Sequence, residues 1–186
     1  MRYEKDEGMK TVNDSDLIVG YEGKTYSINE LKEKAKTFEY GKNLDIKSQF
    51  EEVYNNPSEE NLEGEVWVRL SQKGWTNYIV SNKARVPWQN GSDKPILLRQ
   101  VDEIYKGAPH TGYLVFDPKQ LPGQIQHGFH VWRLVAMGFL GLQKFDSRIV
   151  HHIDNNGYDC RPENLILVNT SQHAVIHESK FPKKEI

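Results

Sequence analysis

The segment from Arg148 to His177 constrains this chain most, because its apolar runs, turn residues and histidines fit one compact supersecondary unit. RIVHHI and LILV are β-prone, and the loop between them is rich in Asn, Asp, Gly and Pro. Thr170 or Ser171 can cap a helix that begins at Gln172. The segment therefore predicts a strand, a loop, a second strand and a helix, in that order.

The spacing of four histidines in this segment predicts a metal site. His173 and His177 are four residues apart on the predicted helix, so both imidazoles project from one face and can reach one ion. His151 and His152 are adjacent in a predicted strand, so their side chains leave on opposite sides. One of these two can bind the ion while the other acts as a base, which is the division that phosphodiester hydrolysis requires.

The residues VHHID, PENL and H-x3-H of this segment resemble the HNH, or ββα-metal, nuclease motif. The resemblance implies that His152 is the general base and that His151 is the first metal ligand. It also implies that Asn164 braces the loop between the strands and that His173 is the ligand on the helix. His177 is similar to the additional helix ligand of bacterial toxin nucleases, so the expected ligand set is His151, His173 and His177.

One divalent metal ion is the expected cofactor. Phage homing members of the family often have Asp and Asn at the first and last ligand positions, whereas this chain has His at both. We expect Mg²⁺ to be the ion in use, with Mn²⁺, Ni²⁺ or Zn²⁺ as alternatives. Cys160 is the only cysteine, which excludes a disulfide framework and a paired-cysteine zinc knuckle. Any metal must therefore be bound by histidine or oxygen.

A second resemblance lies upstream of this segment. GEVWVRL…GWTNYIVSNKARV resembles the modular segment that precedes HNH domains in phage homing endonucleases, and GYLVFD…FHVWRLVAMGFLG resembles their next strand and helix. The resemblance implies double-stranded DNA as the partner, a phage-encoded protein and a homing role; a restriction, packaging or DNA-degrading nuclease is the alternative within the same chemistry. Trp132 stands where the family has a His before Arg, so no role of that His is carried over.

The predicted fold is α+β, with a β-rich upstream part and a packed helix followed by a C-terminal ββα-metal (HNH) finger. Three parts are expected: an acidic N-terminal appendage of unknown role at 1–63, the modular DNA-contacting segment at 64–128, and the nuclease domain at 129–186. Because residues 1–63 resemble nothing, we expect cleavage to persist without them.

Local patterns within these parts predict several further elements. Residues 17–28 read as a hairpin that turns at Glu22 and Gly23, and Asn29 is the expected N-cap of the helix that follows. A second helix is expected at Ile46–Tyr54 and a short strand at Ile96–Leu98. FHVWRLVAMGFLGL predicts a strand and then a helix that ends near Gly141.

The charge of the chain is unevenly distributed. The net charge is −2 at pH 7, yet residues 1–65 carry nine Lys and Arg against sixteen Asp and Glu, whereas residues 66–186 carry fifteen against ten. All seven histidines also lie in the second part. This asymmetry is typical of a nucleic-acid-facing domain with an acidic appendage, and equally of unrelated solvated faces. The residues expected to face DNA are Arg133, Arg148, Arg161, Lys144, Tyr78, Asn82 and Arg85.

Two other function classes stay open. A non-catalytic nucleic-acid-binding module could hold a structural zinc with its four histidines, and an RNA-cleaving nuclease could have the same fold. No apolar run is long enough for a membrane helix, and the first residues are too charged for a secretory signal. We therefore expect no membrane partner and an intracellular protein in the cytoplasm of a bacterial host. The sequence leaves the oligomeric state open.

Overall fold

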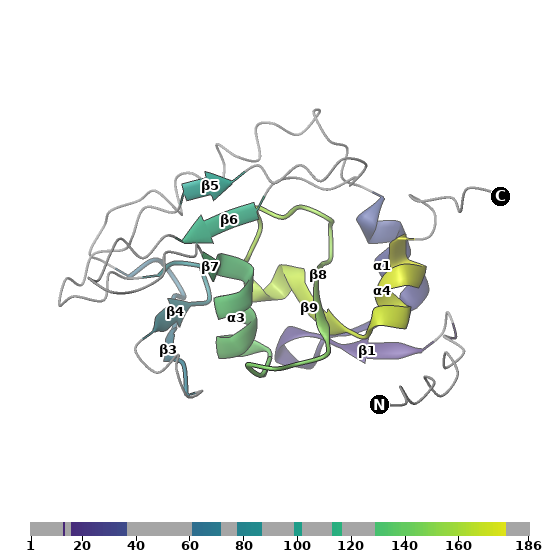
Figure 1. Ribbon diagram of the computed structural model, residues 1–186, viewed down its shortest axis with the longest axis horizontal. Helices are drawn as coiled ribbons and strands as arrows, with labels where there is room; N and C mark the ends of the chain where they lie inside the picture. The colour runs from purple at the N-terminus through teal and green to yellow at the C-terminus, as the bar shows by residue number, and fades with distance from the viewer. Residues whose placement is uncertain are drawn as a thin grey trace, which may run out of the picture.

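The computed structural model describes residues 13, 16–36, 61–71, 78–86, 99–101, 113–116 and 129–177, with only the backbone for 99–101, 113–116 and 129 (Figure 1). Its short antiparallel strand pairs and helices confirm the α+β class. In chain order the elements are β1 (Leu17–Val19), η1 (Tyr21–Gly23), β2 (Thr25–Ser27), α1 (Ile28–Ala35), β3 (Trp67–Arg69), β4 (Ile79–Ser81), β5 (Arg99–Val101), β6 (Tyr113–Phe116), β7 (Phe129–His130), α3 (Val131–Phe139), β8 (Ile149–His152), η2 (Pro162–Asn164), β9 (Leu165–Val168) and α4 (Thr170–His177). Among the described residues, no helix is long and apolar enough to cross a membrane.

The first described unit is the hairpin of β1 and β2, which leads directly into α1. The strands are antiparallel, and the chain reverses through Glu22 and Gly23, whose φ angles of 56° and 76° lie in the left-handed region. The predicted turn at these two residues is confirmed. The Ser27 hydroxyl accepts a hydrogen bond of 3.1 Å from the backbone N–H of Glu30 and caps α1. The prediction of Asn29 as the cap was therefore wrong, because the helix begins at Ile28, two residues before the start that a cap at Asn29 would give.

The C-terminal segment folds as strand, loop, strand and helix, as the sequence predicts. β8 and β9 are antiparallel, with His151 opposite Ile166 and His152 opposite Leu165. Directly opposed residues of an antiparallel pair lie on the same face of the sheet. The two histidines therefore belong to opposite faces of the β8–β9 pair.

A reciprocal cap fixes the start of α4. The Asn169 side chain accepts a hydrogen bond of 2.8 Å from the backbone N–H of Gln172, and the Gln172 side chain accepts one of 2.9 Å from the backbone N–H of Asn169. Two helix-terminal donors are thus satisfied by one pair of side chains. The predicted cap at Thr170 or Ser171 was one or two residues late, because both lie within the helix.

The β8–β9 pair lies between two hydrophobic cores. Figure 1 shows α3 on one side of the pair and α1 with α4 on the other. The apolar residues of β9 contribute to both cores. Leu165 and Leu167 pack in the core with α3, whereas Ile166 and Val168 pack in the core with α1 and α4. An uninterrupted apolar strand is the pattern expected when both faces are buried.

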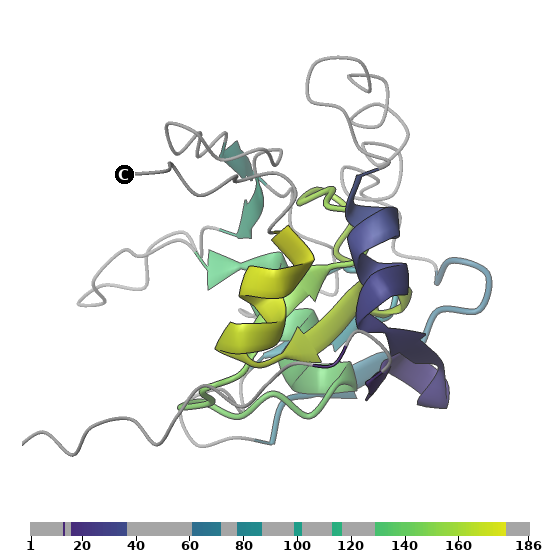
Figure 2. The same cartoon turned by 90° about the vertical axis from the view of Figure 1, so that its right-hand side faces the viewer.

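The core on the α4 side joins the N-terminal unit to the C-terminal one. Figure 2 shows α1 and α4 side by side in front of the strands. Leu31 of α1 and Ile166 of β9 are fully buried in this core, and Ile176 of α4 is 1% exposed. Residues 17–35 therefore pack against the ββα unit, which the expectation of a separate appendage did not anticipate. The three-part division itself stays a prediction, since residues 37–60 lie outside the described residues.

The core on the α3 side joins the upstream hairpin to the ββα unit. β3 and β4 are antiparallel and pack against α3 at Gly138, where a Cβ would lie 2.8 Å from Val80 Cγ1. Arg99–Val101, Tyr113–Phe116 and the first residues of the strand-then-helix segment form a separate three-stranded sheet in the order β5–β6–β7. The predicted helix at Ile46–Tyr54 and the predicted strand at Ile96–Leu98 lie outside the described residues.

Candidate metal centre

Three histidine side chains converge between β8 and α4. The ring centroid of His151 lies 5.8 Å from that of His173 and 5.1 Å from that of His177, and the two rings of α4 are 4.6 Å apart. His151 is buried and the other two are half-buried. One nitrogen of each ring lies within 4.8 Å of the corresponding nitrogens of the other two. The structure thus brings together the three residues that the sequence analysis predicted as metal ligands.

Local structure explains why these rings meet. His173 and His177 are four positions apart, which puts them one above the other on a helix face. The face of the sheet that carries His151 also carries Ile166, which packs in one core with Ile176 of α4. Because α4 is anchored on this face, its two imidazoles are held beside the ring of β8.

The donor set fits a divalent transition metal. Zn–N bonds are about 2.0–2.1 Å long, so nitrogens around one tetrahedral ion are about 3.4 Å apart. The three nitrogens lie within 4.8 Å of one another, so binding of one ion would draw the imidazoles closer together. Imidazole suits Zn²⁺ and Ni²⁺, whereas Mg²⁺ prefers oxygen. Among the described residues, the cluster offers three nitrogens and no carboxylate.

His152 lies outside this cluster of described residues and occupies the last position of β8. It is 7% exposed and lies on the sheet face of Leu165. Its carbonyl accepts a hydrogen bond of 2.8 Å from the N–H of Asn155, whose φ of 63° marks a tight turn. The chain therefore leaves the strand immediately after this histidine and enters the loop. That His152 faces the same cleft as the three ligands stays a prediction.

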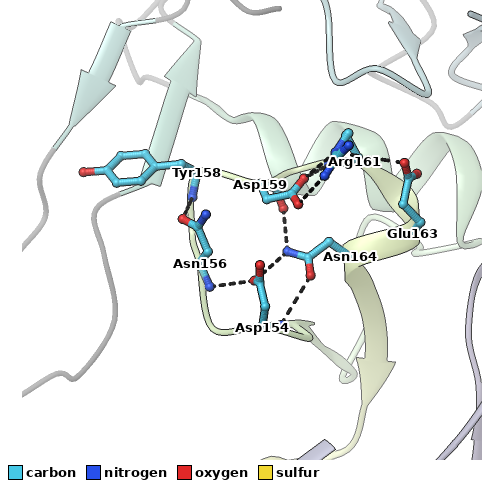
Figure 3. A network of polar contacts seen from close by, with 7 residues as sticks. All are labelled: Asp154, Asn156, Tyr158, Asp159, Arg161, Glu163 and Asn164. Atoms are coloured by element: carbon cyan, nitrogen blue, oxygen red, sulfur yellow. Dashed lines mark hydrogen bonds and ion pairs between the residues drawn. The ribbon is translucent and has the colours of Figure 1, made fainter. Parts of the chain in front are cut away.

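Asn164 joins the two ends of that loop (Figure 3). Its Nδ2 donates hydrogen bonds of 2.9 Å to Asp154 Oδ1 and 3.0 Å to the Asp159 carbonyl. Its Oδ1 accepts one of 3.3 Å from the backbone N–H of Asp154. Three hydrogen bonds from one buried amide fix the loop two residues beyond His152, which agrees with the bracing position predicted for this asparagine.

The two aspartates of the loop are held in different ways. The pKa of Asp154 is raised above its ordinary value, and burial of the carboxyl is the largest cause. Hydrogen bonds from the Asn156 N–H and from Asn164 lower this pKa, whereas the neighbouring charge of Asp159 raises it. Asp159 instead forms a bidentate pair with Arg161, with both nitrogen–oxygen distances at 2.8 Å (Figure 3). Neither aspartate was predicted to brace the loop.

The three upstream residues expected to face DNA have structural partners. Arg85 is 2% exposed and forms an ion pair of 2.6 Å with Glu65, whose side chain is fully buried. Burial would raise the pKa of Glu65, but hydrogen bonds from Arg85 and from backbone N–H of Leu62 leave it lowered. The prediction of Arg85 as a DNA contact was therefore wrong, because its guanidinium is committed to this buried pair.

The other two upstream residues are also engaged within the protein. Asn82 accepts a hydrogen bond of 2.8 Å from Val66 N–H and donates one of 3.0 Å to the Gly64 carbonyl, so its amide ties the ends of the hairpin. Tyr78 is partly buried against the core, and burial raises the pKa of its hydroxyl. Both side chains therefore have structural contacts within the protein.

The four basic residues predicted near the site lie at least partly at the surface. Arg148 and Arg161 keep 45% and 37% of their side chains exposed while they pair with Asp146 and Asp159. Arg133 donates to the carbonyl of Lys144 at 2.9 Å. Their contact with nucleic acid stays a prediction.

Comparison with known proteins links this geometry to one family. Residues 130–175 match the family model described as HNH endonuclease. No curated protein and no solved structure matches the chain. The matched segment runs from β7 into α4 and covers less than half of the chain, and it includes His151, His152, Asn164 and His173. The match supports the HNH family for this C-terminal part and indicates a nuclease, a hydrolase that acts on nucleic acid.

Proposed function

We propose that this protein is a metal-dependent endonuclease that hydrolyses phosphodiester bonds of double-stranded DNA. The observation that carries the proposal is the cluster of His151, His173 and His177, which forms within the same ββα unit that matches the HNH endonuclease family. Three protein ligands leave coordination positions open, as catalytic metal sites require and closed structural sites do not.

The proposed ligands are the three clustered imidazoles. A bound divalent ion would neutralise the scissile phosphate and stabilise the charge that develops on the departing oxygen. We propose Zn²⁺ or Ni²⁺ before Mn²⁺ or Mg²⁺, because the described donors are nitrogens and the latter two ions favour oxygen. This order revises the expectation drawn from the sequence, in which Mg²⁺ came first.

His152 is the proposed general base. It neighbours the ligand His151 but leaves the strand on the other face, so its imidazole is not among the clustered donors. Imidazole titrates near neutral pH and can take a proton from the attacking water. Asn164 is proposed as a positioning residue, because its three hydrogen bonds fix the loop that follows the base.

Double-stranded DNA is the proposed substrate, with RNA as the alternative. The excess of basic residues after residue 65 and the resemblance of the upstream segment to phage homing endonucleases support DNA. The same resemblance supports a homing role and a phage-encoded protein. A nuclease that acts inside a bacterial cell is consistent with this role.

A plasmid-cleavage assay tests the proposed function. Supercoiled plasmid is incubated with protein in EDTA and then with each metal, and a structured RNA is run in parallel. We expect DNA cleavage that EDTA abolishes, and a loss of about 10²–10⁴-fold in rate for His152→Ala with metal affinity retained. His173→Ala should lower the metal affinity measured by calorimetry. His130→Ala, a histidine outside the cluster, is the matched control and should cleave normally.

The structural-zinc alternative gives a different result in the same samples. If the ion were structural, chelation would unfold the protein, as seen by circular dichroism, and no added metal would produce cleavage. We expect the fold to survive chelation, because the cores on both sides of β8–β9 are built from apolar side chains of α1, α3 and β9 whose packing needs no ion. Unfolding in EDTA without any cleavage would refute the proposed endonuclease.

A further inference from the structure

A fully exposed phenylalanine lies on the turn between α3 and β8. Phe145 is 92% exposed, whereas every other aromatic residue whose side chain the structure describes is at least partly buried. Single exposed apolar residues are common on protein surfaces and need no special role. The turn that carries this ring is held by several side-chain hydrogen bonds and one ion pair.

The carboxylate of Asp146 fixes the turn from within. It accepts hydrogen bonds of 3.0 Å from the backbone N–H groups of Gln143 and Arg148, on the two sides of the ring-bearing residue. It also pairs with the Arg148 guanidinium at 2.7 Å. These contacts hold the pKa of Asp146 well below its usual range, with the Arg148 hydrogen bond as the largest cause.

Side chains of Arg133, Gln143 and Arg148 also donate hydrogen bonds to the backbone of the turn. Arg133 of α3 donates a hydrogen bond of 2.9 Å to the Lys144 carbonyl. Gln143 Nε2 and Arg148 Nη2 donate to the Gly141 carbonyl at 3.2 and 3.3 Å. The chain therefore presents the ring on a pre-organised support, which lowers the conformational entropy lost when a partner binds.

The charges around the ring favour an anionic, aromatic-stacking partner. Lys144 Nζ lies 5.3 Å from the centroid of the Phe145 ring, and the side chain of Arg148, on the same turn, is 45% exposed. Arg133 adds a third cation, and Asp146 is the one carboxylate in these contacts. Nucleic acid combines a phosphate backbone, which Lys and Arg attract, with base faces on which an aromatic ring can stack.

The ring also lies within reach of a nucleic acid held at the histidine cluster. Phe145 and His151 are six positions apart along the chain, and six extended residues span at most about 20–22 Å. Successive bases of duplex DNA rise about 3.4 Å, so this span corresponds to about six base pairs. Phe145 therefore lies no farther from His151 than the length of such a duplex segment.

We propose that Phe145 is a wedge that inserts between base pairs of duplex DNA, with Lys144 and Arg148 contacting the flanking phosphates. This inference rests on the proposed endonuclease function and adds a binding contact to it. Apolar side chains that insert in this way partly unstack a base step and bend the duplex. The wedge would fix the position of the duplex relative to the three histidines.

The test measures binding of a fluorescein-labelled 30-base-pair duplex in EDTA, so that no cleavage is needed. Aromatic stacking on single-stranded bases is worth about 1–3 kcal/mol, and a wedge must also unstack the duplex step, so Phe145→Ala should weaken binding several-fold and by at most about 140-fold. Phe145→Trp should restore most of the affinity. Leu17→Ala, which removes another exposed apolar side chain at 68% exposure, is the matched control and should bind normally.

A second readout separates stacking from simple loss of apolar surface. A duplex that carries 2-aminopurine should change its fluorescence with wild-type protein and with Phe145→Trp, but not with Phe145→Ala. Binding of Phe145→Ala within twofold of wild type, or an equal loss in Leu17→Ala, overturns the wedge. If Phe145→Ala lowers affinity but wild-type protein never cuts plasmid, the endonuclease proposal fails and the wedge stands. If plasmid is cut and Phe145→Ala binds normally, only the wedge fails.

Discussion

Leu31→Ala should destabilise the ββα unit, although the substitution lies far from it in sequence. Leu31 is fully buried on α1, in the core shared with Ile166 of β9 and Ile176 of α4. The change removes three carbons, worth about 2.4 kcal/mol at roughly 0.8 kcal/mol per buried methylene. The cavity left behind adds to this cost, and Leu→Ala substitutions in cores range over about 2–5 kcal/mol. The free energy of unfolding should therefore fall by at least about 2 kcal/mol.

Urea unfolding followed by circular dichroism measures this effect. With a slope of about 2 kcal/mol per molar urea, the midpoint should fall by about 1 M or more while the slope stays unchanged. Leu17→Ala is the matched control, because it makes the same chemical change at a side chain that is 68% exposed. Its midpoint should move by less than about a quarter of that shift.

The result that refutes this reasoning is a midpoint for Leu31→Ala equal to that of Leu17→Ala. Such a result would mean that α1 contributes no stability to the core it shares with α4. A chain that starts at Asn61 gives an independent check. We now expect it to be less stable than the full chain, because it lacks the residues of β1, β2 and α1 that cover Ile166 and Ile176. Equal stability would restore the view that the N-terminal part is a dispensable appendage.

Three further predictions follow from single contacts. Asn164→Ala should cost about 1–3 kcal/mol in thermal or urea unfolding, because it leaves buried partners of the loop without their hydrogen bonds. Gly138→Ala should cost about 1–3 kcal/mol in the same assay, since the added methyl meets β4 at 2.8 Å. The lowered pKa of Asp146 stabilises the folded state above the ordinary pKa of an aspartate and loses this effect as pH falls toward the folded value. Asp146→Asn should therefore flatten the acid side of a plot of urea midpoint against pH, and an unchanged acid limb would contradict the role of its pair with Arg148.

Elements with strong local signals could be predicted from the sequence. β8, β9 and α4 follow from β-prone runs, a turn-rich loop and an H-x3-H spacing, all within thirty residues. The convergence of His151 with His173 and His177 needed one further step, the family resemblance. The sequence alone left open which of the two adjacent histidines faces α4. Alternation along a strand puts their side chains on opposite faces, but it does not tell which face lies against the helix.

Helix caps were predicted less well, because several residues near each helix start can serve as the cap. Ser27 and Asn29 flank the start of α1, and both residue types are good caps. The backbone decides between them: Ser27 has the extended φ and ψ of −79° and 159° that a cap requires. At α4, the pairing of Asn169 with Gln172 has the spacing of a capping box, which was a usable signal in the sequence.

Contacts between distant residues could not be predicted from local patterns. Arg85 and Glu65 are twenty residues apart, and the hairpin of β3 and β4 brings them together. A buried Arg is rare unless it is paired, so its burial could be recognised only once its partner was known. The apolar spacing of Ile28, Leu31 and Ala35 on α1 predicts that the helix has a buried face, but not that α4 covers it.

The packing of α1 bears directly on the metal site. Two of the three proposed ligands lie on α4, a helix of eight residues that would be marginal in isolation. Its only described residue that is fully buried is Ile176, which lies in the core with α1 and stands next to His177. The position of both helical imidazoles therefore depends on a core to which the N-terminal unit contributes five buried residues, although the family match begins only at residue 130. The ligands of the candidate site lie between residues 151 and 177, but the support that holds two of them begins at residue 18.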